Sequence, residues 1–419
     1  MRDRVQNTSR LWYLNSGFDL ELSGELTHHL HGAIAQMTHW FIPAAAPGDF
    51  VLVDLPTPAD FLDYLSGIGL APARSVVGNA PSGLSGEAWG WSESSVERLL
   101  TQGAEVCHPP LGIVREVNSR AFCHKIGVEN DLGTPGAYLE SDPARLLDEN
   151  PRRSTPSYRG PIVIKAMHSN AGRAMTVHRR DQWSAKQVSF LKKLSACGHA
   201  VVVEPWLQRV ADISTMFYLN ASGQFSRAMH YWTLIGPDGH CAGDFIEPGT
   251  EDFEKWNEAL ARSMEVAGRE LSLAGYFGPV GLDHFLYKSR QEIKLAAMVD
   301  INARHTLGSL AVALQGKLNP KRPLLLRLIS RKKHRLPGDY DSLKKLLGDL
   351  WWSRQRGQGV ILLTALRIKS GGAIVQPARS LFCIQAEDRG SLRAMYSQLL
   401  VRIGNKLDTR VPFELIDTR

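Results

Sequence analysis

Residues 281–304 read GLDHFLYKSRQEIKLAAMVDINAR, two runs of strand-forming residues joined by a polar turn. This pattern predicts a β-hairpin whose turn centres between Gln291 and Glu292. Asp283 and Asp300 would then lie opposite each other on the two strands, with their Cβ atoms about 5 Å apart. Two carboxylates at that distance repel unless a shared proton or a cation lies between them. The hairpin is therefore the first candidate for a functional site.

The residues that follow Asp300 strengthen the prediction of a metal site. Asn302 and Arg304 come at i+2 and i+4, and strand alternation directs these side chains to the face of Asp300. Asp283, Asp300 and Asn302 would supply two carboxylates and an amide oxygen, which suit Mg²⁺, with Mn²⁺ as an alternative. Arg304 would stabilise a transferring phosphoryl group. In the simpler alternative the two aspartates end their strands and Arg304 neutralises them.

A candidate phosphate-binding lysine lies upstream. Lys165 is near the end of an apolar run within residues 162–175, IVIKAMHSNAGRAM, and a loop of small residues follows it. The lysine would supply a point charge, and backbone N–H groups of the loop could close over phosphates. The candidate loop residues are Ser169, Asn170 and Gly172. An ordinary hairpin turn is the alternative.

A third candidate segment, residues 201–219, reads VVVEPWLQRVADISTMFYL and predicts two strands joined by a hinge. Such a hinge can present backbone groups to the edge of an adenine base. Glu204 could accept a hydrogen bond from the adenine amino group, and Asp212 could accept one from the ribose hydroxyls. The hinge residues are Pro205, Trp206 and Leu207. The alternative is a plain connection that carries two exposed acids.

Taken in order, these segments resemble the ATP-grasp superfamily over roughly residues 115–313. Lys165 with its loop is similar to that family's phosphate lysine and lid, residues 204–207 resemble its adenine hinge, and Asp283 with residues 300–304 resembles its metal-binding motif. Arg120 stands where many members have a second nucleotide-contacting lysine, and Lys125 is the other candidate. Asp300 replaces the usual glutamate of the motif.

The resemblance implies two α/β subdomains that clasp ATP, with one or two Mg²⁺ ions on its phosphates. It also implies an acyl-phosphate intermediate that an amine attacks. The function expected is thus a carboxylate–amine ligase that forms an amide bond and releases ADP and phosphate. Two alternatives remain: a phosphotransferase of the same fold, and a non-catalytic protein that binds a nucleotide or a partner. His230, Tyr231, Trp232 and His305 are candidates for the substrate pocket by their proximity to the motifs.

The fold class expected is α/β (α+β), an ATP-grasp fold with flanking domains. We expect an N-terminal α/β domain over residues 1–115, the ATP-grasp core over 116–313 and a small C-terminal α/β domain over 314–419. Within the core, apolar residues at helix spacing predict a helix over 254–274, and Gly275 stands where a helix cap would. The role of the basic, leucine-rich C-terminal region is open.

Composition narrows the classes of protein that need to be considered. The 419 residues contain 43% hydrophobic and 22% charged residues, a balance typical of globular proteins, and they carry a net charge of +7. A polar N-terminus and the lack of long apolar runs indicate neither secretion nor a membrane span, and five scattered cysteines fit a reducing cytoplasm. Nucleic acid is a disfavoured partner, because the basic run 331–335 has no accompanying recognition motif. The expected partners are small-molecule carboxylate and amine substrates, with a homodimer as an open alternative.

Overall fold

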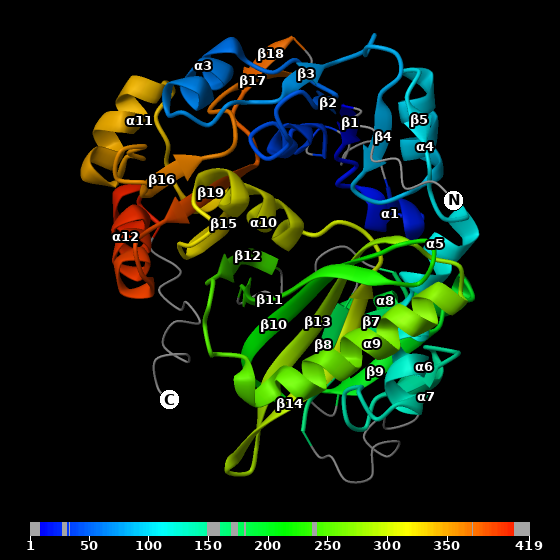
Figure 1. Cartoon of the computed structure of the whole chain (residues 1–419). Coiled ribbons are helices and arrows are strands. Elements are labelled where there is room, and N and C mark those ends of the chain that lie inside the picture. The colour runs from blue at the N-terminus through cyan, green and yellow to red at the C-terminus, as the bar shows by residue number, and fades with distance from the viewer. Residues whose placement is uncertain are drawn as a thin grey trace.

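In the structure, a computed structural model, most strands belong to three sheets, and helices pack on these sheets (Figure 1). A fourth, two-stranded sheet joins β17 (Ile368–Ser370) and β18 (Ala373–Val375). The structure describes residues 9–26, 32, 34–148, 160–168, 175–179, 182–236, 241–370 and 372–405.

The N-terminal sheet is entirely parallel, in the order β3-β2-β1-β4-β5. The strand order reverses at β1, so the carboxyl ends of β1 and β4 flank a topological switch point, where ligands of such sheets bind. The short helices α1 (Phe18–Leu22) and η1 (Thr38–Phe41) follow β1. The strands and covering helices are β1 (Arg10–Tyr13), β2 (Phe50–Leu52), α3 (Ala59–Gly67), β3 (Arg74–Val76), β4 (Ser85–Ala88), α4 (Glu93–Thr101) and β5 (Glu105–Val106).

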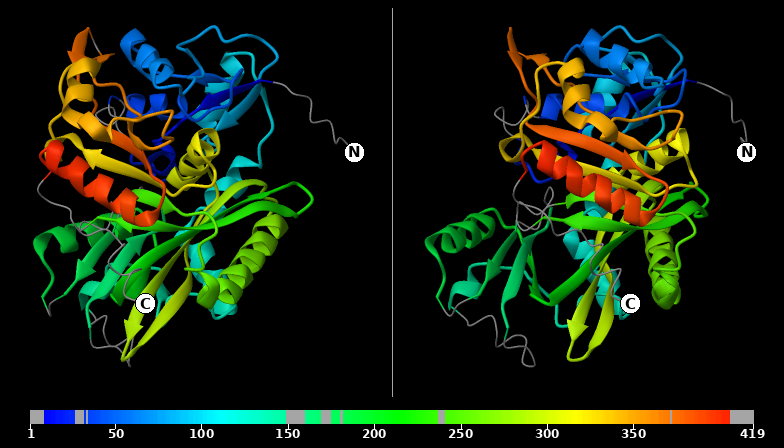
Figure 2. Two further views of the ribbon diagram at one scale, coloured as in Figure 1. Left: turned by 60° about the vertical axis from the view of Figure 1, so that its left-hand side comes forward. Right: turned by 90° about the vertical axis from the view of Figure 1, so that its left-hand side faces the viewer.

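A small antiparallel sheet with the order β6-β9-β7-β8 carries the predicted phosphate lysine. The first strand predicted within residues 201–219 is confirmed as β9 (Val201–Pro205), and it pairs with β7 (Ile162–Ala166), which carries Lys165. Figure 2 shows this sheet standing beside the larger sheet in the lower half of the molecule. Its elements, with the helices that lead to it, are α5 (Leu111–Val117), α6 (Arg120–Glu129), β6 (Tyr138–Glu140), α7 (Arg145–Asp148), β7 (Ile162–Ala166), β8 (Met175–His178), α8 (Ala185–Ala196) and β9 (Val201–Pro205).

The largest sheet has eight strands in the order β14-β13-β10-β11-β12-β15-β19-β16. Strands of the expected C-terminal domain, β15, β16 and β19, therefore continue the sheet of the expected core, while the boundaries at 115 and 313 stay predictions. The strands are β10 (Gln208–Leu219), β11 (Phe225–Ile235), β12 (Cys241–Ile246), β13 (Gly278–Ser289), β14 (Glu292–Asn302), β15 (Leu324–Ser330), β16 (Gly359–Leu362) and β19 (Arg379–Gln385).

Helices cover this sheet along its length. The helix predicted over 254–274 is confirmed as η2 (Glu254–Trp256) and α9 (Asn257–Leu273), and α9 packs on β10 and β14. Gly275 follows it with φ +90° and donates its N–H to Ser272 O, the left-handed cap expected. The remaining helices of this part of the chain are α10 (Leu307–Leu318), α11 (Tyr340–Leu347), α12 (Arg389–Arg402), η3 (Arg331–Lys333) and η4 (Gly348–Leu350).

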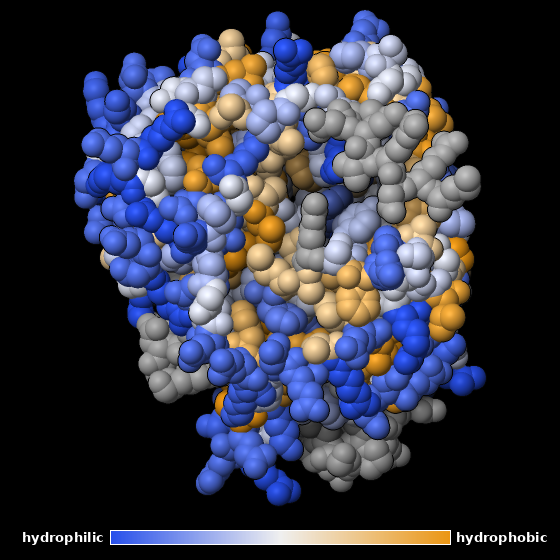
Figure 3. Space-filling view, viewed as in Figure 1, coloured by the Kyte–Doolittle hydropathy of each residue, from blue (hydrophilic) through white to orange (hydrophobic). Residues whose placement is uncertain are grey.

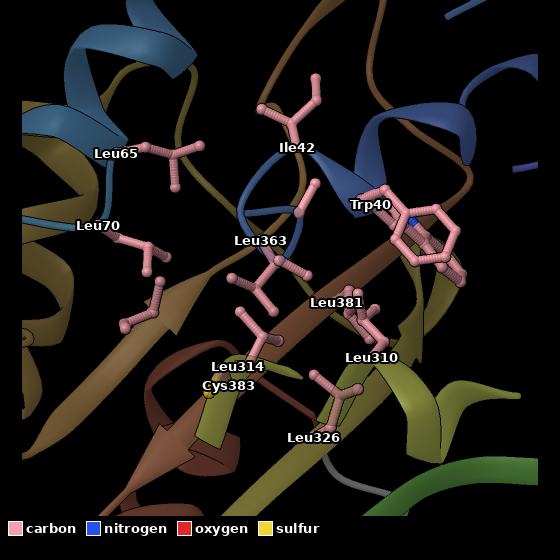
Figure 4. Close-up of a cluster of buried hydrophobic side chains, with 14 of the residues drawn as sticks. Trp40, Ile42, Leu65, Leu70, Leu310, Leu314, Leu326, Leu363, Leu381 and Cys383 are labelled. Carbon is pink, nitrogen blue, oxygen red and sulfur yellow. The ribbon is translucent and has the colours of Figure 1, made fainter. Parts of the chain in front are cut away.

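One hydrophobic core joins the N-terminal and C-terminal parts of the chain. Trp40 and Leu65 from the first hundred residues pack with Leu310 of α10 and with Leu363 and Leu381 near the C-terminal strands (Figure 4). This core packs the N-terminal part of the chain against α10 and the C-terminal strands. No helix in the described part of the chain is long and apolar enough to cross a membrane.

Candidate functional site

A cavity of about 580 Å³ lies where the three sheets meet, within the range of roughly 300–1,000 Å³ typical of ligand pockets. On the face shown in Figure 3, hydrophobic residues gather around a central hollow, and hydrophilic residues dominate the periphery. Eleven residues of the sequence-based site line the cavity: Arg120, Lys165, Glu204, Pro205, Trp206, Leu207, Asp212, Asp283, Asp300, Asn302 and Arg304. The other three, Ser169, Asn170 and Gly172, lie outside the described residues.

The two aspartates of the predicted hairpin face each other across the ladder of β13 and β14. The predicted pairing of Asp283 with Asp300 is confirmed. The predicted position of the turn is wrong, because the strands pair Ser289 with Glu292, so the turn falls one residue earlier. A bulge then adds two residues to β14 between the pair Phe285–Ala296 and the pair of aspartates.

Asp283 is half-buried at the centre of this site and is held by two hydrogen bonds. Ser214 Oγ donates to its Oδ1 at 2.8 Å, and Asn302 Nδ2 donates to its Oδ2 at 3.0 Å. Burial, and then the charge of Asp300, raise the pKa of Asp283 to about 6. Two partly desolvated carboxylates side by side are stabilised by a divalent cation, so the two aspartates fit such an ion.

Asn302 and Arg304 extend the site toward the N-terminal sheet. Arg304 Nη2 donates to Asn302 Oδ1 at 2.9 Å, so the amide nitrogen of Asn302, and not its oxygen, faces Asp283 here. Arg304 Nε donates to Asp19 Oδ1 of α1 at 3.0 Å. Arg304 is thus held between Asn302 and Asp19, which lies 285 positions away from it in the sequence.

Arg120 begins α6 and bridges the small sheet to the acid pair. Its Nη1 donates to Ala166 O at 2.6 Å, and its Nη2 lies 3.7 Å from Asp300 Oδ2. Ser119 caps the helix by accepting from the N–H of Phe122. Lys125, the alternative candidate, is not among the described residues that line the cavity.

Lys165 and Glu204 form a buried ion pair between β7 and β9. Lys165 Nζ lies 2.7 Å from Glu204 Oε2, and the two side chains are only 9% and 8% exposed. The alternative reading of Glu204 as an exposed acid on a plain connection is therefore wrong. The pair places one positive and one negative charge on the wall of the cavity.

The hinge from Pro205 to Leu207 is held by backbone hydrogen bonds. Trp206 N donates to Pro161 O at 2.8 Å, and Leu207 N donates to Pro205 O at 3.0 Å. Beyond the hinge, Arg209 Nη1 donates to Asp212 Oδ1 at 2.8 Å. Burial raises the pKa of Asp212, and Arg209 opposes that shift. The hinge N–H groups and the Asp212 carboxylate, which are expected to lie near a nucleotide, thus make hydrogen bonds within the protein in this structure.

Sequence reasoning missed several residues of the cavity. Asp19 and Trp89, which follow β1 and β4 at the switch point, line it, as does Asp244 of β12. The carboxyl ends of parallel strands were a usable signal for the first two. Asp244 had none, since its segment carries no motif. Of the four guessed substrate-pocket residues, Tyr231 lines the cavity, and His230, Trp232 and His305 are not among its described lining residues.

The arrangement of the sheets and the cavity between them is the ATP-grasp fold, as similar solved structures show. The chain resembles phosphoribosylamine–glycine ligase from Thermotoga maritima with a TM-score of 0.54 and 13% identity, covering 94% of this chain and 96% of that one. It resembles N5-carboxyaminoimidazole ribonucleotide synthetase from Thermus thermophilus with a TM-score of 0.51 and 15% identity, covering 96% and 99%.

A third similar structure is a beta-gamma-ATP complex of biotin carboxylase from Campylobacter jejuni, with a TM-score of 0.50, 11% identity and coverage of 94% and 91%. No protein-family model and no curated protein sequence matches the chain. At these identities the likeness establishes the fold and not the chemistry of the cavity.

Proposed function

We propose that this chain is an ATP- and Mg²⁺-dependent ligase that joins a carboxylate to an amine and releases ADP and phosphate. The observation that carries the proposal is the convergence of the acid pair Asp283–Asp300 with Arg120, Lys165 and Arg304 on one cavity. Structures with the same fold include a phosphoribosylamine–glycine ligase, which supports this reaction class.

In this proposal the nucleotide lies between the small sheet and the eight-stranded sheet. The adenine would contact the hinge at residues 204–207, and Asp212 would accept from the ribose hydroxyls. Lys165 and Arg120 would face the phosphates. Since each of these cations already contacts an acid, phosphate binding exchanges one anionic partner for another.

Asp283, Asp300 and Asn302 are the residues that would hold Mg²⁺. The raised pKa of Asp283 supports this, because a carboxylate that is costly to ionise alone is stabilised by a nearby cation. For Asn302 to join through its oxygen, its amide would have to exchange the contacts it makes with Asp283 and Arg304. When bound, the ion supplies charge neutralisation on the phosphates during phosphoryl transfer.

The proposed reaction has two steps. A carboxylate oxygen of the substrate attacks the γ-phosphorus, the bond to the β–γ bridging oxygen breaks, and ADP leaves with the electron pair. The amine lone pair then attacks the acyl carbon of the acyl phosphate, and phosphate leaves as the C–N bond forms, while the surplus protons of the amine pass to phosphate and solvent. Arg304, fixed by Asp19 and Asn302, is oriented to stabilise the charge on the transferring group.

The test is release of ADP and phosphate by the purified full chain with Mg-ATP, screened against pools of carboxylates with and without amines. We expect release that requires both a carboxylate and an amine. A phosphorylated acceptor that forms without any amine would identify a phosphotransferase instead. If no pool gives release and calorimetry detects no Mg-ATP binding, the proposal is wrong.

A further inference from the structure

The charges on the cavity wall are mostly arranged in pairs. Four cations lie next to an acid: Lys165 by Glu204 at 2.7 Å, Arg209 by Asp212 at 2.8 Å, Arg304 by Asp19 at 3.0 Å and Arg120 by Asp300 at 3.7 Å. Of the other two lining acids, Asp283 belongs to the proposed metal site. Asp244 is the remaining acid, and no salt bridge joins it to a cation of the described residues.

Asp244 also accepts few hydrogen bonds for a buried carboxylate. It is 2% exposed, and its Oδ1 accepts one hydrogen bond, from Thr233 Oγ1 at 3.1 Å. Its Oδ2 has no hydrogen-bond partner among the described residues. A buried carboxylate oxygen without a donor is costly, so the site is suited to a ligand that brings a donor and a positive charge.

Apolar side chains form another part of the cavity wall. Tyr231, two residues before Thr233 on β11, belongs to the hydrophobic core that the N-terminal and C-terminal parts of the chain share. The lining residues that pack in this core define what we call the apolar half: Leu14, Met37, Trp40, Trp89, Leu307 and Leu328. These side chains suit the body of a ligand rather than its charged group.

A chain of hydroxyl groups connects Asp244 to the acid pair. Thr233 Oγ1, which donates to Asp244, lies 2.8 Å from Ser214 Oγ, and Ser214 Oγ donates to Asp283. A group held at Asp244 is therefore only two side chains away from the proposed site of phosphoryl transfer.

From these contacts we propose that the apolar half binds the amine substrate, an organic ammonium ion with an apolar body, whose nitrogen donates to Asp244. This inference rests on the proposed ligase function, because it assigns the second substrate of that reaction. It also distinguishes the chain from an enzyme for a phosphorylated substrate. The acid at this position suits a cationic ligand, and four of the lining cations already contact acids.

The test is calorimetric titration of the full chain with Mg-ADP present, using 2-phenylethylamine and two probes of similar shape, 2-phenylethanol and 3-phenylpropanoate. The ammonium ion should bind about tenfold or more tightly than the alcohol, as a charge-assisted hydrogen bond implies. Asp244→Asn should abolish this preference. Asp49→Asn is the matched control, because Asp49 is also a buried acid, lies outside the cavity and should keep the preference.

Equal binding of the amine and the alcohol by the native chain would overturn the inference, as would a preference for 3-phenylpropanoate. Loss of the preference in Asp49→Asn to the same extent as in Asp244→Asn would also contradict it. If Asp244→Asn does not fold, the ratio of the amine affinity to the alcohol affinity, measured on the native chain, decides whether the inference holds. Binding of Mg-ADP is measured first, and its absence would count against the ligase proposal, whereas absent amine selectivity with intact Mg-ADP binding counts only against this inference.

Discussion

The buried pair of Lys165 and Glu204 makes each residue depend on the other for stability as well as for function. Lys165→Met would leave the Glu204 carboxylate buried without its cation, which we expect to lower the free energy of unfolding by about 3–5 kcal/mol. The double variant Lys165→Met/Glu204→Gln should regain most of that loss, since no isolated charge remains. Urea unfolding measures both values.

Neither variant should support ATP turnover, because both lack the cation proposed to contact the phosphates. The double variant is the matched control that separates the two roles of Lys165. A stable double variant with normal phosphate release would show that Lys165 is a structural residue only.

The pKa of Asp283 predicts how metal binding depends on pH. Without metal, the folded state holds this proton more tightly than the unfolded chain, so raising the pH from about 4 to 6 lowers the free energy of unfolding. Mg²⁺ needs the ionised carboxylate and competes with the proton. The rise in melting temperature caused by Mg²⁺ without nucleotide should be full above about pH 7 and be lost as the pH falls through 6.

Asp300→Asn provides the control for this measurement. It removes one of the two carboxylates and should abolish most of the Mg²⁺ effect at every pH. A stabilisation by Mg²⁺ that persists unchanged below pH 5 would place the ion at a site other than Asp283.

Much of the site could be predicted at the level of single residues. A count of positions along the predicted hairpin gave the pairing of Asp283 with Asp300, and Lys165 and the hinge at 204–207 were predicted from their positions at strand ends. The partners of these residues could not be predicted, because Asp19 and Ser214 come from elements whose contacts depend on the packing of whole sheets.

At the level of elements, β12 joins the core strands to the C-terminal strands through a close backbone approach. Gly243 has φ +154°, and a Cβ there would lie 2.1 Å from Leu326 O of β15. Gly243→Ala should therefore lower the free energy of unfolding by more than about 3 kcal/mol. Thermal and urea unfolding check this value.

Gly275→Ala at the end of α9 is the matched control. This glycine also has positive φ, at +90°, but an added Cβ would meet no atom within 4 Å. Its cost should be confined to the backbone, about 1 kcal/mol. Equal losses in the two variants would show that the contact with Leu326 does not decide the effect.

Elements with regular periodicity were predicted better than their irregularities. The helix over 254–274 was predicted from apolar spacing, and its cap from the glycine that follows the last apolar position. The turn and the two-residue bulge of the β13–β14 hairpin could not be located, because a bulge restores the pairing of the aspartates after an earlier turn. A simple count of positions gave the right pair for an incorrect reason.

At the scale of the whole molecule, the C-terminal strands complete both a sheet and a core. A chain ending at Leu318 would lack β15, β16 and β19 and would expose the core that Trp40, Leu65 and Leu310 share with Leu363. We expect this fragment not to fold, as judged by soluble expression and far-UV circular dichroism. A folded fragment that binds Mg-ATP would show that the expected boundary at 313 is a true domain boundary.

A milder change tests the same core. Leu363 is fully buried, and Leu363→Ala should lower the free energy of unfolding by about 2–5 kcal/mol. The N-terminal and C-terminal parts should unfold in one transition. Sequence reasoning could not predict this arrangement, because the contacts join residues some 300 positions apart, and only the α/β character of each part was readable.

The most direct test of the central claim uses the carboxylate that the phosphate-release screen identifies, labelled with ¹⁸O in its carboxyl group. If the cavity activates a carboxylate as an acyl phosphate, one labelled oxygen should appear in the released phosphate for each turnover, and Asp300→Asn should release none. Phosphate without label, formed at the rate of amide formation, would contradict the account.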